Sequence, residues 1–106
     1  MILTFEQIKS SVKPIAEKYG LRAVYLFGSY ARNEATEDSD IDLLIDRTGS
    51  NVKTLFDMGG LFDELKESLD KEIDVVTTQT LEQKSTMERT PDFIKTIERE
   101  RVPIYG

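Results

Sequence analysis

The stretch FGSYARNEATEDSDIDLLID, residues 27–46, decides what this chain can fold into and which chemistry it can carry. It begins at the end of an apolar run, RAVYLFG over residues 22–28, whose β-branched and aromatic residues predict a strand buried on both faces. It ends in DIDLLID over residues 40–46, where side chains alternate in character and predict a second strand with two different faces. The polar residues 30–39 between the two strands predict a short helical turn followed by a loop.

Asp40 and Asp42 stand one residue apart at the start of the second predicted strand. Residues i and i+2 of a strand project from the same face, so the two carboxylates repel each other unless a cation lies between them. Mg²⁺ takes oxygen ligands, often one or two carboxylates together with substrate phosphates. Upstream, Gly28 and Ser29 lie where a strand turns into a helix, a place that lets a phosphate approach backbone N–H groups. The pattern predicts a phosphate-binding turn beside a metal site, the outline of phosphoryl or nucleotidyl transfer.

A third carboxylate, Asp74, lies in the alternating segment EIDVVT, residues 72–77. If this strand pairs beside residues 40–46, Asp74 meets the first two carboxylates and can hold a second metal or accept the proton of an attacking hydroxyl. Asp46 could join the metal-binding face, but it is interpreted as the residue that ends the second strand against a turn. The remaining acidic residues of the intervening loop are interpreted as a solvated face: Glu34, Glu37 and Asp38.

The first helix is predicted over residues 3–19, where apolar residues recur at i, i+3 and i+4. Thr4 and Gln7 make a capping box at its start, and Gly20 provides a stop. Pro14 is difficult to place inside a helix, because proline removes a backbone donor and clashes with the preceding turn. It either kinks this helix or divides it.

A second helix is predicted over residues 53–69. Its apolar side is expected to consist of Leu55, Phe56, Leu61, Phe62, Leu65 and Leu69. Gly59 and Gly60 in its middle cost about 1 kcal/mol each relative to Ala, and they indicate either close packing of the helix on the sheet or a break. The large aromatic residues are interpreted as core or helix packing and not as base-stacking residues: Tyr19, Tyr25, Phe27, Phe56 and Phe62.

Three further elements are predicted near the end of the sequence. Residues 80–88 and 92–100 have helical patterns, and Thr90 or Asp92 is expected to cap the second of these helices. The segment VPIY, residues 102–105, predicts an edge strand, where a proline is tolerated. Together the elements predict one α/β (α+β) domain over residues 1–106, with a small mixed sheet of about four strands backed by helices.

Composition limits the chemistry and the cellular setting. The chain has 106 residues, 39% hydrophobic and 32% charged, with neither His nor Cys. Serine–histidine triads, thiol nucleophiles and ordinary zinc sites are therefore excluded, and catalysis must use carboxylates, hydroxyls, Lys, Arg or a metal. The net charge of −6 argues against direct, sequence-independent nucleic-acid binding. No apolar run is long enough for a membrane helix, MILTFEQIKS does not resemble a signal peptide, and the absence of Cys favours a cytoplasmic protein.

The motifs resemble the signature of the nucleotidyltransferase superfamily that includes DNA polymerase β. GSYAR, residues 28–32, and SDIDL, residues 39–43, are similar to its paired motifs, and Asp74 is similar to its third Asp on a later strand. The likeness continues through FDMGGLFDELKESLDKEIDVVT, residues 56–77, and RERVPIYG, residues 99–106, so it covers nearly the whole chain. The short length resembles the minimal nucleotidyltransferase branch, which includes the MntA-like antitoxins of HEPN/MNT toxin–antitoxin pairs.

The resemblance implies an ATP-using enzyme with two Mg²⁺ ions that transfers AMP to a hydroxyl and releases pyrophosphate. It implies that Asp40 and Asp42 hold the metals, and that Asp74 holds one metal or takes the acceptor proton. The residues that match the nucleotide-binding positions are Gly28, Ser29, Arg32 and Ser39. The family usually has Gly where this chain has Asn33, and Asn is the next most tolerant residue of a left-handed backbone. Arg32 is open to a second role, bracing the loop through a salt bridge to Glu34 or Asp38.

The acceptor implied by the resemblance is a partner protein. A chain of this length leaves no room for the helical domain with which larger family members hold small acceptors. Minimal members of this type are typically paired with a HEPN ribonuclease toxin, and the resemblance implies a hetero-oligomer in which a toxin tyrosine receives AMP. Two alternatives remain: a binding module that only masks its partner, and the catalytic subunit of a two-chain enzyme that modifies a small molecule.

Overall fold

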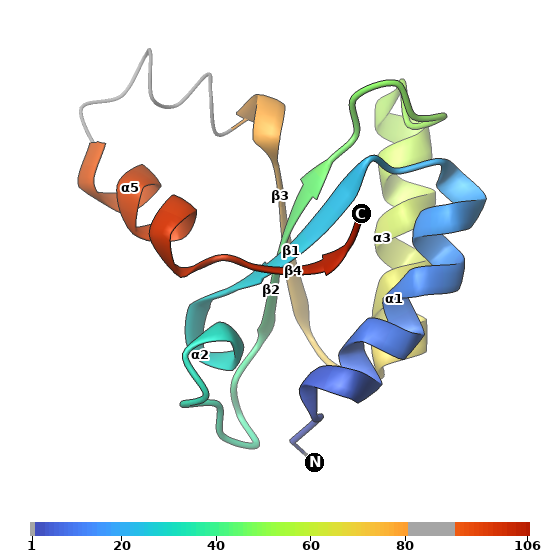
Figure 1. Cartoon of the computed structure of the whole chain (residues 1–106). Helices are drawn as coiled ribbons and strands as arrows, with labels where there is room; N and C mark the ends of the chain where they lie inside the picture. The colour runs from blue at the N-terminus through green and yellow to red at the C-terminus, as the bar shows by residue number, and fades with distance from the viewer. Residues whose placement is uncertain (1, 81–90) are drawn as a thin grey trace.

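Four strands form one mixed sheet in the order β3-β2-β1-β4 (Figure 1). The strands are β1 (Ala23–Phe27), β2 (Ile41–Asp46), β3 (Ile73–Thr77) and β4 (Val102–Tyr105). β1 is antiparallel to both β2 and β4, whereas β2 and β3 are parallel. The predicted mixed sheet is confirmed, and the segment VPIY lies at its edge, where Pro103 removes no hydrogen bond from a central strand.

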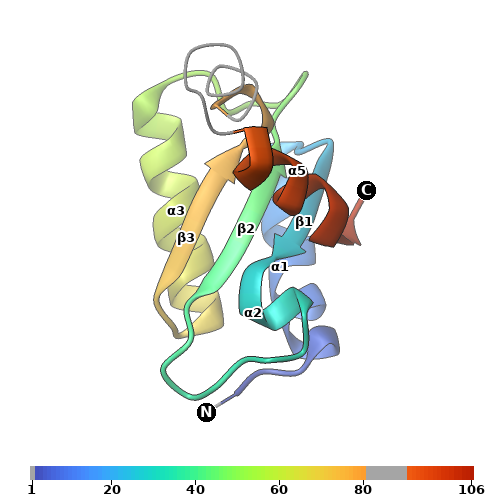
Figure 2. The same cartoon turned by 90° about the vertical axis from the view of Figure 1, so that its left-hand side faces the viewer.

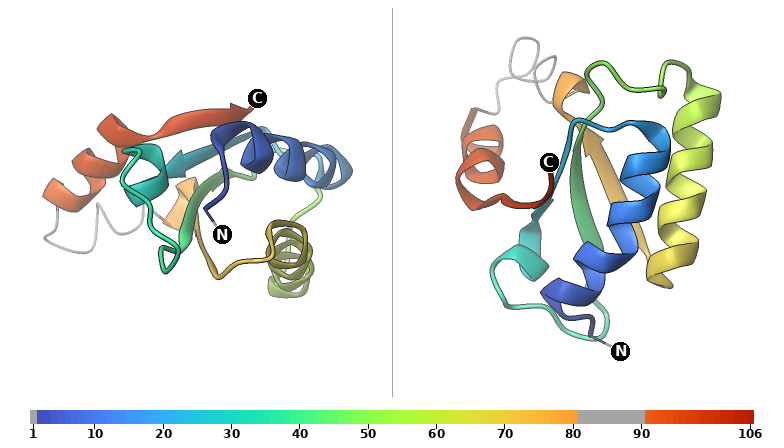
Figure 3. Two further views of the ribbon diagram at one scale, coloured as in Figure 1. Left: turned by 90° about the horizontal axis from the view of Figure 1, so that it is seen from below. Right: turned by 45° about the vertical axis from the view of Figure 1, so that its right-hand side comes forward.

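Helices cover both faces of the sheet. α1 (Phe5–Tyr19) and α3 (Leu55–Leu69) lie side by side on one face, and α5 (Pro91–Glu100) lies on the other (Figures 1 and 3). The four-residue helix α2 (Gly28–Ala31) follows directly from the end of β1, and Figure 2 shows it beside the start of β2. This computed structural model describes residues 2–80 and 91–106. The predicted helix over residues 80–88 and the predicted cap Thr90 lie outside the described residues, except for Thr80, and Asp92 lies inside α5 and does not precede it.

The two faces of β2 carry different residues, as the alternating sequence predicts. Ile41, Leu43 and Ile45 are fully buried in the core beneath α1 and α3. On the opposite face Leu44 is buried with Phe27 of β1 and Ile97 of α5. Full burial of an aliphatic or aromatic side chain contributes roughly 1.5–3 kcal/mol, so packing on both sides fixes the plane of the sheet.

The helix boundaries follow local side-chain chemistry. The Thr4 hydroxyl accepts a hydrogen bond from the Gln7 backbone N–H, and the Gln7 side chain accepts one from the Thr4 backbone, which completes the predicted capping box of α1. Thr54 and Asp57 form the same arrangement at the start of α3. Pro14 lies within α1, which is continuous from Phe5 to Tyr19, so the prediction that it divides the helix is wrong.

Two residues assigned from sequence to the apolar side of α3 are exposed. Leu55 is 90% exposed and Phe56 is 91% exposed, so the interpretation of Phe56 as a packing residue is wrong. The buried stripe of α3 is Leu61, Leu65 and Leu69. Phe56 precedes Leu65 by nine residues, about 2.5 helical turns, and therefore points away from that stripe. Leu55 is the first residue of the helix and lies on the flank of the stripe.

Gly59 and Gly60 do not break α3. A Cβ atom at Gly60 would lie 3.2 Å from the Tyr19 hydroxyl, tighter than an ordinary van der Waals contact. Gly60 therefore permits close packing, but of α3 against α1 and not against the sheet. A Cβ at Gly59 would meet no atom within 4 Å. The same interface contains a hydrogen bond from the Tyr19 hydroxyl to Glu64, which also pairs with Lys18 at 2.8 Å.

None of the helices within residues 2–80 and 91–106 combines the length and the apolar character needed to cross a bilayer.

Candidate active site

The candidate site lies at the edge of the sheet where β1 ends and β2 and β3 begin. Phe27, the last residue of β1, is the register partner of Asp42, and Asp42 is in turn the register partner of Asp74. Because β2 and β3 are parallel, their first residues lie at the same end of the strands. Neighbouring strands of a sheet lie about 4.8 Å apart. The predicted pairing of Asp74 beside the Asp40–Asp42 strand is confirmed. Asp40 lies just before β2 and is exposed.

Gly28 is required at its position by Asp42. Its φ of +75° is in the left-handed region, which favours glycine. A Cβ atom at Gly28 would overlap Oδ2 of Asp42 and lie 3.1 Å from the Cγ of the same side chain. The Asp42 carboxylate therefore lies directly against the glycine turn. From the sequence, a glycine at position 28 was explained by the need for a phosphate to approach the backbone. The steric reason is additional, and it depends on a contact between residues fourteen positions apart in the sequence.

The electrostatics of the site centre on Asp42. Burial, together with repulsion from the neighbouring Asp74 and Asp40, raises the pKa of its carboxyl from 3.8 to about 6, while Arg32 opposes the rise. A half-buried carboxylate with two like-charged neighbours is destabilised when ionised, and a cation is the group that relieves this repulsion. The arrangement therefore favours binding of a positive ion.

The donor set suits Mg²⁺ together with a phosphorylated substrate. Within residues 2–80 and 91–106, no three acidic side chains are gathered into a ready-made metal site. Asp42 and Asp74 nevertheless present two carboxylates from paired positions on adjacent strands. Mg²⁺ is typically bound by one or two carboxylates plus substrate phosphates, and it seldom occupies an all-protein cage. The residues present fit such an ion.

The turn that follows Gly28 is short and internally bonded. The Arg32 backbone N–H donates to the Gly28 carbonyl at 3.1 Å, and the Glu34 N–H donates to the Ser29 carbonyl at 2.9 Å. The residue before the turn, Phe27, has no side chain that can accept hydrogen bonds from the first amides of α2. Asn33 adopts a left-handed φ of 58°, so the expectation that Asn replaces the usual Gly without loss of the turn is confirmed.

Arg32 is held by two carboxylates. Its Nε donates to Glu34 Oε2 at 3.2 Å, and its Nη1 donates to Glu100 Oε2 at 3.0 Å. The salt bridge to Glu34 confirms one of the two partners predicted for a loop-bracing role, whereas no salt bridge to Asp38 is found among the described residues. Glu100 was missed by sequence reasoning, because nothing local links it to a residue 68 positions away.

Ser39 and Asp46, two polar residues that flank Asp40 and Asp42 in the sequence, have local partners. The Ser39 hydroxyl accepts a hydrogen bond from the Thr36 backbone N–H at 2.9 Å and lies 3.3 Å from the Thr36 hydroxyl, so it braces the loop. Asp46 accepts from the Thr48 N–H at 3.0 Å and lies 3.8 Å from Arg22. Burial raises the pKa of Asp46, but the hydrogen bonds with Thr48 and the charge of Arg22 together outweigh it, so the net pKa is lowered. Asp46 therefore ends the strand against a turn, as predicted.

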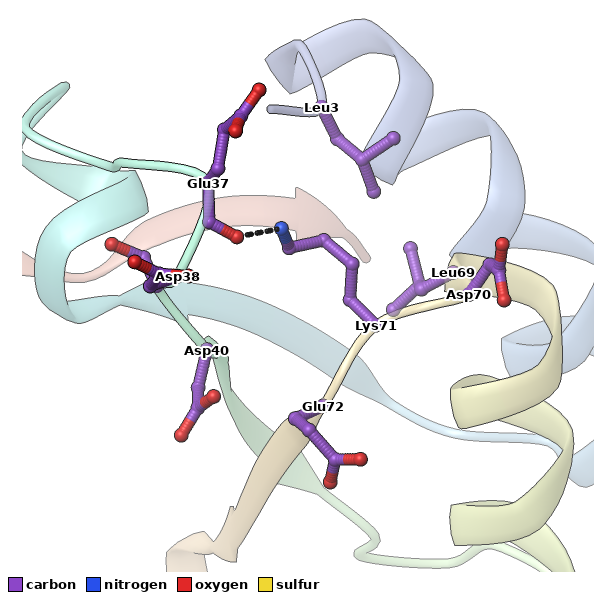
Figure 4. A pocket seen from close by; sticks show the side chains of 9 residues that line it. Leu3, Glu37, Asp38, Asp40, Leu69, Asp70, Lys71 and Glu72 are labelled. Carbon is purple, nitrogen blue, oxygen red and sulfur yellow. Dashed lines mark hydrogen bonds between the residues drawn. The ribbon is translucent and has the colours of Figure 1, made fainter. Parts of the chain in front are cut away.

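A cavity of about 470 Å³ is lined in part by Asp40 (Figure 4). Its lining is rich in carboxylates, including Glu37, Asp70 and Glu72, and Lys71 reaches across it to donate to the Glu37 carbonyl at 3.0 Å. Such a lining is unfavourable for a triphosphate. The glycine turn is the better place for the phosphates of a nucleotide.

A mixed four-stranded sheet with a glycine turn pressed against paired carboxylates defines a polymerase β-like minimal nucleotidyltransferase fold. The chain belongs to the nucleotidyltransferase domain family, whose model matches residues 7–104. It is accordingly an enzyme of the nucleotidyltransferase class.

Relatives named as adenylyltransferases support the same family. The Methanocaldococcus jannaschii protein named "Putative protein adenylyltransferase MJ0435" is 42% identical over 79 residues, which cover 74% of this chain and 83% of that protein. "Protein adenylyltransferase MntA" of Thermococcus cleftensis is 36% identical over 84 residues, which cover 76% of this chain and 83% of that protein. The chain is thus homologous to the MntA adenylyltransferases.

Solved structures share the fold. One, named "Structure of putative minimal nucleotidyltransferase", has a TM-score of 0.68 and 30% identity, covering 95% of this chain and 96% of the other. A second, named "Crystal structure of the toxin-antitoxin with AMP-PNP", has a TM-score of 0.68 and 19% identity, covering 92% of this chain and 73% of that one. At 19% identity the second comparison shows a shared fold.

Proposed function

We propose that this chain is an antitoxin that transfers AMP from ATP to a hydroxyl of a partner protein, a tyrosine of a helical HEPN ribonuclease toxin. The observation that carries the proposal is the register pairing of Asp42 with Asp74 beside Gly28. The naming of two relatives as protein adenylyltransferases, and of a structural neighbour as a toxin–antitoxin assembly, supports a protein acceptor. The net charge of −6 also suits a basic, RNA-binding partner.

Each site residue has a role in the proposed reaction. The turn at Gly28 and Ser29 binds the triphosphate, and Arg32 contributes positive charge at its edge. Asp40, Asp42 and Asp74 would hold Mg²⁺, which when bound supplies neutralisation of the charge on the transferring phosphate. Ser39 keeps the loop in place so that Asp40 stays at the start of β2.

The proposed transfer forms one P–O bond and breaks another. The acceptor oxygen attacks the α-phosphorus of ATP, a new P–O bond forms, and the bond from that phosphorus to the β-phosphate breaks. Pyrophosphate leaves with the electron pair of the broken bond. The acceptor proton passes to the Asp74 carboxylate, which is exposed and lies on the strand beside Asp42.

The test uses this chain co-expressed with the helical protein encoded next to it. The purified pair is incubated with ATP and Mg²⁺, and intact-mass spectrometry of the helical protein follows. We expect a gain of one or more AMP units, mapped by peptide sequencing to a tyrosine. Asp40→Ala and Asp42→Ala are expected to abolish the gain while the two proteins still co-purify, because both changes lie at the sheet edge and remove no core side chain.

Other outcomes separate the alternatives. A tight complex without any mass gain would favour a module that neutralises its partner by masking. Modification of a small molecule in the presence of the partner would instead identify a two-chain enzyme. Full transfer activity in either alanine variant would exclude the sheet-edge carboxylates as the site.

A further inference from the structure

Arg32 is held by two carboxylates, one two residues away in the sequence and one 68 residues away. Glu34 contacts its Nε at 3.2 Å from the following loop, and Glu100 contacts its Nη1 at 3.0 Å from the last turn of α5. A guanidinium presents its donors in a rigid planar fork, so two carboxylates on different nitrogens set both its position and its plane. The sequence assigned Arg32 a nucleotide role or a bracing role. The two roles are compatible if the bracing residues hold it at the nucleotide site.

Arg32 lies at the candidate site. It follows α2 directly, its backbone N–H is bonded to the Gly28 carbonyl, and its charge acts on the Asp42 carboxylate. The side chain is 41% exposed, so a bound phosphate can reach it. The two salt bridges use two of the five N–H groups of the guanidinium, which leaves donors for another anion.

Glu100 is the firmer of the two supports. Its side chain is 25% exposed, against 66% for Glu34, so water screens its interaction with Arg32 less. The backbone around it is anchored on both sides. Ile97, one turn earlier, is buried against the sheet, and the Arg101 guanidinium stacks on the Tyr25 ring at 4.5 Å.

We propose that Glu100 is a positioning residue: its carboxylate holds the Arg32 guanidinium at the edge of the nucleotide site, and thereby couples helix α5 to nucleotide binding. The inference rests on the proposed function in that Arg32 contacts the phosphates of the nucleotide. A carboxylate close to a triphosphate also repels it, so the two effects of Glu100 on affinity have opposite signs. Positioning is expected to dominate because Glu100 is paired directly with the Arg32 guanidinium at 3.0 Å, which offsets most of the repulsion that this carboxylate exerts on a phosphate.

The experiment measures binding of AMP-PNP with Mg²⁺ by titration calorimetry, which needs no acceptor. Glu100→Ala is expected to raise Kd about 3- to 10-fold, the cost of ordering one long side chain on binding. Glu100→Gln keeps an oxygen acceptor for Arg32 without the charge, and is expected to bind within about 2-fold of the wild type. Glu98→Ala is the matched control: Glu98 is an exposed glutamate on the same helix and has the same charge.

A double-mutant cycle separates positioning from general damage. In an Arg32→Ala background, Glu100→Ala is expected to have no further effect on Kd, because the residue through which it acts has gone. A further rise in that background would assign Glu100 to fold stability and overturn the proposal. Tighter binding in both Glu100→Ala and Glu100→Gln would also overturn the proposal, since repulsion would then dominate. An unchanged Kd in Glu100→Ala would overturn it too.

The binding experiment also separates this inference from the proposed function. If wild-type protein binds AMP-PNP with the expected dependence on Glu100 but transfers nothing to its partner, the positioning role stands and the acceptor proposal fails. If wild-type protein does not bind AMP-PNP, both fail.

Discussion

Asp42→Asn is expected to stabilise the metal-free protein while removing its activity. Burial, with Asp74 and Asp40 beside it, raises the pKa of Asp42 to about 6, against 3.8 for an unperturbed carboxyl. At pH 7 that difference corresponds to about 3 kcal/mol of destabilisation of the folded state. Asp42 is only half-buried and solvent screens part of the effect, so we expect a gain of about 1–2 kcal/mol for Asn. For a domain of this size the gain raises Tm by about 5–10 °C.

The pH dependence identifies the cause. Well below pH 3.8 the carboxyl is protonated in both the folded and the unfolded chain, so it makes no contribution to the pH dependence of stability. As the pH rises from about 4 to 6 the unfolded chain ionises first, and stability is lost over that interval because the folded pKa is the higher one. Asn does not ionise. The difference in the free energy of unfolding between the variant and the wild type should therefore have its full value at pH 7.5 and fall to about a third of it at pH 4.5.

The assay is urea unfolding in the presence of EDTA at pH 7.5 and pH 4.5. Asp63→Asn is the control, since Asp63 is an exposed acidic residue on α3 and the same change there should leave stability within about 0.5 kcal/mol. Adding Mg²⁺ and AMP-PNP should stabilise the wild type by mass action and not the Asn variant. The reasoning is refuted if Asp42→Asn is no more stable than the wild type at pH 7.5. It is also refuted if the variant gains the same free energy of unfolding at both pH values.

Three further changes test the site and the fold. Gly28→Ala should lower the free energy of unfolding by about 1–3 kcal/mol, because alanine is strained at this left-handed φ. It should also lower turnover by about 100-fold, because the new methyl group displaces the Asp42 carboxylate. Wild-type turnover in this variant would contradict the contact between Gly28 and Asp42. Asp74→Asn should retain nucleotide binding in calorimetry and lose AMP transfer, whereas unchanged transfer would give Asp74 a structural role only. Leu61→Ala should cost about 2–5 kcal/mol in urea unfolding and Phe56→Ala less than about 0.5 kcal/mol, since the first side chain is fully buried and the second is 91% exposed; equal losses would contradict the orientation of α3.

Residues close together in the sequence determined most of the elements. The alternation of DIDLLID set the two faces of β2, and the predicted capping box of α1 is present. These features depend on interactions over a few residues, which the periodicity of helix and strand makes visible in the sequence. The exposed start of α3 escaped the same reasoning, because an apolar residue marks a buried face only when the helix presents that side to the sheet.

Contacts over long separations were decided by the tertiary structure. Sequence could place Asp42 and Asp74 on two strands, but only the parallel pairing of β2 with β3 makes them register partners. The salt bridge from Arg32 to Glu100 arises because α5 packs Ile97 onto the opposite face of the sheet and so brings its last turn to the end of α2. By itself the sequence determined which chemical groups the chain carries and which strands and helices carry them. Their convergence depends on strand register and on the packing of buried side chains, since these alone bring distant segments to a single edge.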